Sequence, residues 1–424
     1  MYFESLNNQA LGNASLDRAL RLADRLTPRE QLALQMRVAR YRGPEAREDE
    51  LVRKIAEEYP SRESWYNAGT TFMRHRRCPQ AIDVLQRSLT LDSMFANAHI
   101  NLATCQQFLG NFPAALAAYS HAWRADSSLM YTSGINHEWG TAMWRARGAH
   151  AADTIFQKML ALSEPDLRAR GFRSLSYLDM TEGRYHDAIQ NLDSAIALAH
   201  VANNAIAEWR NLVIQGDALL TLGESARARE VLRLAHVRQA ALSLSTGFLV
   251  LEGHADVRAG LLELARANAR IASTRRSELQ RDLADLALLN AHITLASRKP
   301  REALNELALA SDTILLPWVR SLRADAYAAL GRRDSALVEL RAMAGSVYFG
   351  YEVQDEWLRT SLRIARLAAQ MGDSATARAA YKSYAERFAK GDAALPELRE
   401  ARAMLGVRAP GVPQKSRSNI DHDH

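Results

Sequence analysis

The stretch LGNFPAALAAY at residues 109–119 decides the fold, because its pattern recurs along the chain. Gly110, Phe112 and Ala115 stand at the spacing Gly-x-aromatic-x-x-Ala, which returns as GRYHDA at residues 183–188. The first stretch contains no side chain suited to catalysis, so its repetition predicts a packing role. Small residues let two antiparallel helices approach closely, and we interpret this stretch as the turn between two such helices.

A small residue is followed twelve positions later by alanine at nine places, and the alanines step by 33 to 41 residues. Glycines between the members of a pair supply backbone freedom after the first helix, and prolines stand where the second helix begins. A larger residue four positions after the alanine is expected to fill the layer towards the next unit. The pairs are Gly69/Ala81, Ala103/Ala115, Gly140/Ala152, Ser176/Ala188, Gly216/Ala228, Gly253/Ala265, Ala291/Ala303, Ala324/Ala336 and Ala365/Ala377. The turn residues are Gly110, Gly183, Gly223, Gly260, Gly331 and Gly372, with Pro79, Pro113 and Pro300 at the starts of second helices.

Composition agrees with a folded, all-helical chain. Of the 424 residues 48% are hydrophobic and 24% charged, and apolar residues recur at the helical period from about Leu16 to Leu405. The two cysteines, Cys78 and Cys105, exclude a disulfide framework. No apolar run is long enough for a membrane helix and the N-terminus does not resemble a signal peptide, so we expect a cytoplasmic protein unless a membrane-anchored half is missing.

The repeated unit resembles the tetratricopeptide repeat (TPR). The best matches are residues 62–95, with Trp65, Gly69 and Ala81 at consensus positions, and residues 96–129, with Gly110 and Tyr119. The resemblance implies an all-α solenoid, a right-handed superhelix of about ten antiparallel helix pairs. We expect divergent repeats at 1–61, two well-matched units at 62–129, divergent units at 130–391, a capping helix at 392–406 and a disordered tail at 407–424.

Two stretches are also similar to the helical-repeat regions of some bacterial serine/threonine protein kinases. They are LADRLTPREQLAL at 22–34 and the stretch at 372–405 that begins GDSATARAAY. No glycine-rich loop, HRD or DFG motif is present, so kinase activity does not follow. This similarity implies the sensory part of a signalling protein as an alternative function.

No motif indicates an enzyme, a metal site or a cofactor. His137-Glu138 begins a zinc-protease motif, but Thr141 stands where its second histidine is needed. The tail residues His422 and His424 alternate with aspartates, but nothing preorganises them as ligands. We therefore predict a non-catalytic protein with no cofactor and no metal.

Nucleic-acid binding is a second alternative, favoured by a net charge of +6 and a pI near 9.4. The basic stretches RHRRC (74–78), RARGFR (168–173) and STRRSELQR (273–281) lie in different units. We interpret them as solvated surface, and nucleic acid as an unlikely partner.

The TPR resemblance places the binding site on the inner faces of the first helices, which line a concave groove that takes up peptides. We predict that this chain binds a protein or peptide partner there as a scaffold or adaptor. The clamp that some family members use for acidic C-termini is absent, because its Lys and Asn positions hold Tyr66/Thr70, Ile100/Thr104 and His137/Thr141. The groove residues implied by the family are Tyr66, Thr70, Ile100, Asn101, Thr104, His137, Thr141, Arg173 and Tyr177, followed by Val213, Asp217, His254, His292, Asp325 and Arg366.

Overall fold

The computed structural model describes residues 9–129, 136–274, 280–310, 316–346 and 354–406, and the regular structure within these ranges is entirely helical. The all-α prediction is therefore confirmed. The helices of the first half are α1 (Gln9–Leu20), α2 (Pro28–Arg42), α3 (Glu45–Glu58), α4 (Arg62–Arg74), α5 (Cys78–Leu91), α6 (Ala96–Phe108), α7 (Phe112–Ala125), α9 (Asn136–Arg147), α10 (Ala149–Leu160), α11 (Pro165–Thr181) and α12 (Tyr185–Val201). Those of the second half are α13 (Ala205–Leu222), α14 (Ser225–Gln239), α15 (Thr246–Arg258), α16 (Leu262–Thr274), α17 (Gln280–Ala296), α18 (Pro300–Leu309), α19 (Leu316–Ala329), α20 (Arg333–Ala344), α21 (Gln354–Leu358), α22 (Thr360–Gln370), α23 (Ser374–Arg387) and α24 (Pro396–Met404). A 3₁₀ turn at Ala23–Arg25 follows α1.

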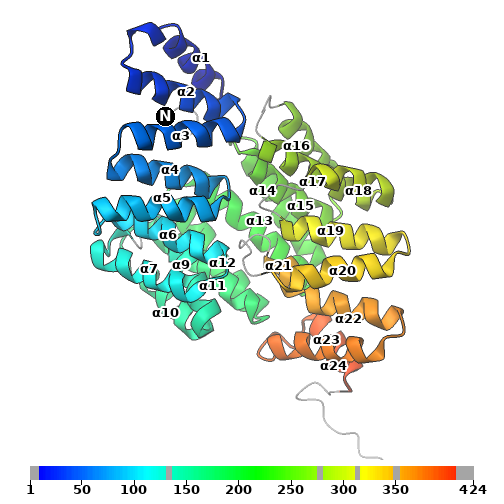
Figure 1. The fold of residues 1–424 in the computed structure, drawn as a ribbon. Coiled ribbons are helices and arrows are strands. Elements are labelled where there is room, and N and C mark those ends of the chain that lie inside the picture. The colour runs from blue at the N-terminus through cyan, green and yellow to red at the C-terminus, as the bar shows by residue number, and fades with distance from the viewer. Residues whose placement is uncertain (1–8, 130–135, 275–279, 311–315, 347–353, 407–424) are drawn as a thin grey trace, which may run out of the picture.

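From α2 to α23 the helices form antiparallel pairs that stack into a solenoid (Figure 1). Within the described ranges, ten pairs run from α2/α3 to α22/α23, and α4 and α6 begin at Arg62 and Ala96. The helix predicted at the C-terminal end of the solenoid is α24. The tail at 407–424, with its two histidines, lies outside the described residues.

The turn between α6 and α7 explains the stretch that defines the repeat. Gly110 adopts a left-handed backbone with φ of 76°, which costs glycine little and other residues more. The Asn111 side chain accepts a hydrogen bond from the Ala114 N–H at 3.4 Å, and Pro113 sits in the first turn of α7. The other five predicted turn glycines have φ between 74° and 95°. In two turns an arginine takes this conformation instead, Arg76 with φ of 59° and Arg298 with φ of 62°.

Small residues of the first helices give room to large residues of the second helices. A Cβ atom added to Gly69 would lie 2.5 Å from Cγ of Leu85, a side chain with no exposed surface. Leu85 also shares a core cluster with Ala98 of α6, in the direction of the predicted contact with the next unit. The close contact within the pair recurs between Gly216 and Leu232.

The pair α15/α16 departs from this pattern. A Cβ on Gly253 would meet Leu289 of α17, because α15 packs more extensively on α17 than α16 does. In this unit the small residue Gly253 therefore contacts the following unit and not its own second helix.

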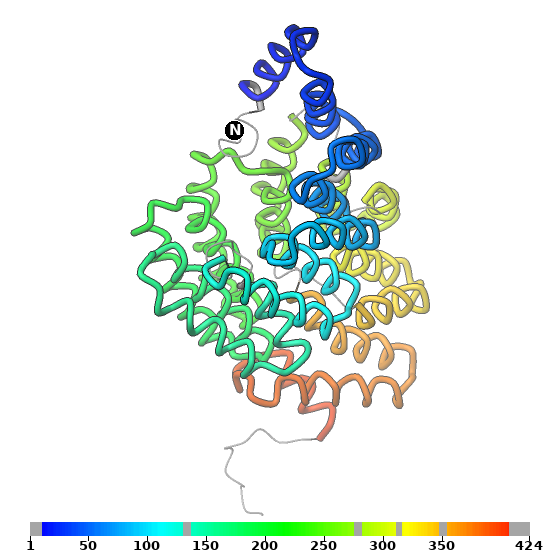
Figure 2. The backbone as a smooth tube through the Cα atoms, turned by 60° about the vertical axis from the view of Figure 1, so that its left-hand side comes forward, coloured from blue at the N-terminus to red at the C-terminus, as the bar shows by residue number. Residues whose placement is uncertain are grey.

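The C-terminal helices return to the middle of the chain, and the region of α23 and α24 comes close to the turn between α11 and α12 (Figures 1 and 2). The Asp392 N–H donates to the Gly183 carbonyl oxygen at 3.0 Å, and the His186 N–H donates to the Asp392 carboxylate at 3.0 Å. Phe388, which is fully buried, packs against Gly183. One core cluster therefore extends from Tyr177 to Ala401.

The basic stretch 74–77 is neutralised within the fold. The His75 imidazole lies 2.8 Å from the carboxylate of Asp49 and 3.2 Å from that of Glu48, both on α3. Arg74 pairs with Glu48 at 2.7 Å, and Arg77 pairs with Asp49. These cations join two units, so the interpretation of this stretch as solvated surface is wrong.

Candidate functional site: the inner face of the first helices

The first predicted groove residues form a row of contacts between consecutive first helices. The Asn101 side-chain amide of α6 donates to the Thr70 hydroxyl of α4 at 2.8 Å. The Tyr66 ring, half-buried, packs on Phe95 with ring centroids 5.0 Å apart. Thr104 is half-buried on the same helix as Asn101. These contacts join the first helices α4 and α6.

Ile100 has a different position from its predicted groove neighbours. Only 1% of its surface is exposed, and it packs with Ala103 and Tyr119 in the core between α6 and α7. A bound segment therefore cannot touch Ile100 without displacing the core.

The row continues through α9 and α11. His137 Nδ1 lies 3.0 Å from the Ser174 hydroxyl, and its ring lies 5.5 Å from that of Tyr177. Burial, followed by the charges of Arg173 and Arg210, holds the pKa of His137 well below its usual range, so the imidazole is neutral at pH 7. The Thr141 hydroxyl donates to the His137 carbonyl oxygen at 3.1 Å.

Arginines gather around an open depression formed by α9, α11 and α13, which we call the arginine depression. Arg170 and Arg173 of α11 and Arg210 of α13 line it, with Glu138 at its α9 side and Ile206 at its rim. Arg170 pairs with Asp166 at 3.0 Å. Burial, and then the charge of Arg210, lowers the pKa of Arg173 to about 10.

Further along, the inner face is covered by the short helix α21 of the same chain. The Gln354 side-chain amide donates to the Tyr177 carbonyl oxygen at 3.1 Å. A small cavity remains here, lined by the predicted groove residues Tyr177, Val213, Asp217 and His254 together with residues of α21. Tyr177 is 2% exposed, so α21 occupies the surface that the resemblance assigns to a partner.

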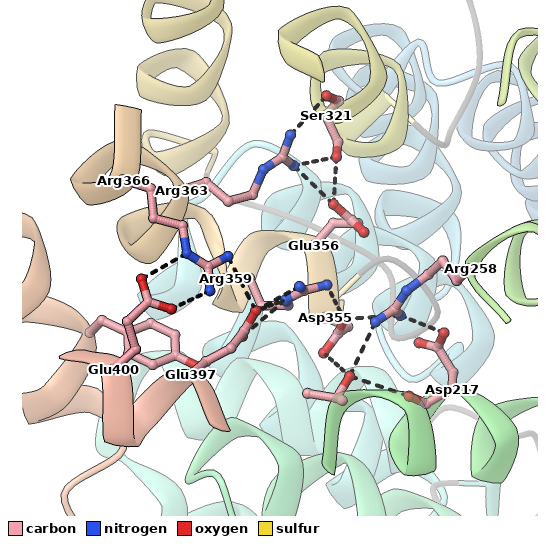
Figure 3. A network of polar contacts seen from close by, with 12 residues as sticks. Asp217, Arg258, Ser321, Asp355, Glu356, Arg359, Arg363, Arg366, Glu397 and Glu400 are labelled. Carbon is pink, nitrogen blue, oxygen red and sulfur yellow. Dashed lines mark hydrogen bonds and ion pairs between the residues drawn. The ribbon is translucent and has the colours of Figure 1, made fainter. Parts of the chain in front are cut away.

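Ion pairs hold α21 on this face (Figure 3). Arg258 of α15 pairs with Asp217 of α13 at 2.5 Å and with Asp355 of α21 at 3.1 Å. Asp355 also accepts a hydrogen bond from the Tyr185 hydroxyl at 3.1 Å. The carboxylate of Asp355 therefore contacts α15, α12 and, through the Thr221 hydroxyl at 3.4 Å, α13.

The carboxylate of Glu356, next to Asp355 on α21, contacts the helices α19 and α22. Glu356 accepts a hydrogen bond from Ser321 of α19 at 2.5 Å and pairs with Arg363 of α22 at 3.1 Å. Burial alone would raise the pKa of Glu356, but the imidazole of His254, whose Nε2 lies 3.9 Å from the carboxylate, and the charge of Arg363 hold it well below its usual range. Glu356 is therefore ionised.

The remaining predicted groove residues lie on or next to this network. His254 stacks on Trp318 with ring centroids 3.9 Å apart and lies 4.2 Å from the ring of His292. Asp325 pairs with Arg363 at 2.6 Å, and Arg366 pairs with Glu400 at 2.5 Å (Figure 3).

The main element absent from the predicted site is α21 itself. Its sequence QDEWL has two acids and two apolar residues, and it does not fit the repeat. The Trp357 ring meets Trp144 of α9 edge-on at 6.3 Å. A segment out of register with the repeat was the only sequence signal for this contact.

Comparison with known proteins bears on the repeat directly. The profile of the family described as Tetratricopeptide repeat matches residues 360–391, which contain α22 and α23. Residues 360–391 of the chain therefore form a tetratricopeptide repeat. No curated protein matches it.

Solved structures with similar folds are distant from this chain in sequence. A tetratricopeptide repeat protein from Parabacteroides merdae has 14% identity and a TM-score of 0.38, with 78% of this chain and 98% of that chain covered. YrrB, described as a TPR protein with an unusual peptide-binding site, has 17% identity and a TM-score of 0.31, with coverages of 46% and 94%. An IFIT1 monomeric mutant with Gppp-AAAA has 10% identity and a TM-score of 0.42, with coverages of 95% and 88%.

Two kinds of feature are absent from the part of the chain that the structure describes. Among the residues described, no helix is long and apolar enough to cross a membrane. Within the same residues, no group of three or more histidine, cysteine or acidic side chains is arranged to hold a metal ion.

Proposed function

We propose that this chain is a non-catalytic scaffold that binds a segment of a partner protein on the inner face between α4 and α13. The observation that carries the proposal is the seat of α21. A short segment lies on the inner face of the same solenoid and is held by a backbone carbonyl, arginines and aromatic side chains. The face between α4 and α13 has the same kinds of groups in Tyr66, Asn101 and Arg173.

A selection from random twelve-residue peptides displayed on phage tests this proposal with the full chain. We expect peptides with a shared sequence pattern to be enriched. Thr104→Arg on the inner face of α6 should weaken their binding at least about ten-fold, because the larger side chain fills the face. Val338→Arg is the matched control, since Val338 lies on the second helix α20 and is 63% exposed. Enrichment of peptides that bind both variants as well as the wild type would refute groove binding.

A further inference from the structure

The arginine depression contains a cation that the fold does not neutralise. Among the described residues no carboxylate lies within ion-pair distance of the half-buried Arg173 guanidinium, whose hydrogen bond to the Asn211 side-chain oxygen is long at 3.5 Å. The acid beside it is engaged elsewhere, because Asp166 pairs with Arg170 and accepts a hydrogen bond from Asn204 at 2.6 Å. A half-buried cation of this kind favours an anionic ligand.

The depression also contains a group that requires a donor. Oε2 of Glu138 is buried and has no hydrogen-bond partner in the described part of the chain. Burial raises the pKa of this carboxyl although Arg210 and Arg173 are near. Either the ionised or the neutral form of Glu138 can accept a hydrogen bond from an N–H group. A nucleic-acid phosphate would meet the arginines but would supply no such donor.

The rim adds an apolar contact. Ile206, at the start of α13, is 45% exposed beside the arginines. A peptide can supply the three complementary groups at once, namely a carboxylate, a backbone N–H and an apolar side chain.

The same solenoid already binds such a segment two repeats further along. There the acids of α21, Asp355 and Glu356, pair with Arg258 and Arg363, while Leu358 enters the adjoining cavity. Pairing of arginines on the inner face with acids of a short segment is thus a mode of contact that this fold uses within itself.

We infer that the arginine depression is a subsite for an acidic peptide segment, with Arg173 binding a side-chain carboxylate of the partner. The inference rests on the proposed function and names the partner's chemistry. The family's clamp for C-terminal carboxylates uses Lys and Asn, and this chain has other residue types at those positions. The proposed subsite differs from that clamp because its ligand is an internal Asp or Glu and its cations lie on α11 and α13.

Two pools of fluorescein-labelled nine-residue peptides test this subsite by anisotropy. The pools have the same randomised flanks and carry either glutamate or glutamine at the central position. We expect the full chain to bind the glutamate pool about ten-fold more tightly, and Arg173→Gln to reduce this preference below about two-fold. Arg227→Gln, on the second helix α14 and half exposed beside Glu224, removes the same charge elsewhere and should keep the preference.

Glu138→Gln provides a second variant with a different expected effect. It keeps a hydrogen-bond acceptor and removes any negative charge that the carboxyl carries beside the arginines, so glutamate-pool binding should be retained or tighten, and a loss of binding would contradict the inference. Equal binding of the two pools by the wild type overturns this inference but leaves the proposed function standing, whereas binding of neither pool refutes both. A twelve-nucleotide single-stranded RNA that binds more tightly than the glutamate pool, and loses affinity in Arg173→Gln, would reassign the depression to phosphate and overturn the inference.

Discussion

Replacing Gly69 by alanine tests whether the repeat conserves small residues for packing. In a helix interior this change alone gains about 1 kcal/mol, because alanine loses less backbone entropy than glycine. The new Cβ would lie 2.5 Å from Cγ and 2.6 Å from Cδ2 of Leu85, which is fully buried and has little room to move. Overpacking of this kind costs about 1–3 kcal/mol, and two contacts this short favour the upper part of that range. We expect a net destabilisation of about 1–2 kcal/mol.

Hydrogen exchange of the peptides that cover α4 and α5 is the appropriate assay, because repeats in a solenoid open locally. Leu85→Ala alone should lower the free energy of unfolding by about 2–5 kcal/mol. The double variant Gly69→Ala/Leu85→Ala should lose at least about 1 kcal/mol less than the sum of the losses in the two single variants, because the new Cβ occupies space that Leu85 has left. Ala103→Gly, at the equivalent position of the next unit, should also destabilise, since that site already accommodates a Cβ. A gain in protection in Gly69→Ala would refute the packing explanation of the repeat.

Four further predictions concern stability. Burial lowers the pKa of His75, but hydrogen bonds to Asp49 and Glu48 raise it to about 9. The protonated imidazole therefore stabilises the fold by roughly 2 kcal/mol, fully below pH 6.5, and this contribution is lost as pH rises through 9. The free energy of unfolding in urea should differ more between pH 6 and pH 10 in the wild type than in His75→Gln. Burial, and then the charge of Glu252, raises the pKa of Asp256 to about 8, so the fold loses stability as pH rises from about 4 to 8. In thermal denaturation Asp256→Asn should therefore be more stable than the wild type at pH 8, by up to roughly 5 kcal/mol, but not at pH 4. Arg298→Gly should stabilise the fold by up to about 1 kcal/mol, because glycine adopts the left-handed backbone without strain. Gly331→Ala, in the corresponding turn between α19 and α20, should destabilise the fold for the opposite reason. A lower melting temperature for Arg298→Gly than for the wild type would contradict the assignment of strain. Asp355→Ala removes one of the two carboxylates that pair with Arg258, the other being Asp217, and should cost about 1–3 kcal/mol, with faster hydrogen exchange in both 354–358 and 182–187. Faster exchange confined to 354–358 would show that α21 does not couple these segments.

The repeat was predictable from the sequence because the residues that determine each turn and each helix start lie within the same unit. Gly110 and Pro113 specify a turn and a helix start whatever follows, and the twelve-residue spacing of Gly69 and Ala81 places two small residues at one helix crossing. These contacts span only a few residues in sequence. The two exceptions at Arg76 and Arg298 lie in turns where tertiary packing overrides the preference for glycine.

The site was predictable only where it depends on single units. Consensus positions predict Thr70, Asn101 and His137 on one face, and in the structure Asn101 contacts Thr70 and His137 contacts Ser174 across neighbouring first helices. The burial of Ile100 depends on how deeply α6 sinks against α7. The seat of α21 depends on pairing Asp355 with Arg258 across nearly a hundred residues, a contact for which no periodic pattern gives the register.

The polar character of the α21 contact argues for a role in geometry more than in stability. Removing Asp355, Glu356 and Arg258 from water is expensive, and ion pairs formed at that cost often contribute little net free energy. Apolar residues could cover the same face without this cost, but they would accept α21 in several registers. Charges that must each meet a particular partner permit one register, which helps to fix the connection between α23 and α24 against the turn between α11 and α12. The same reasoning applies where the inner face carries Arg173: a half-buried cation weakens binding of neutral segments and favours one that brings a carboxylate to that position.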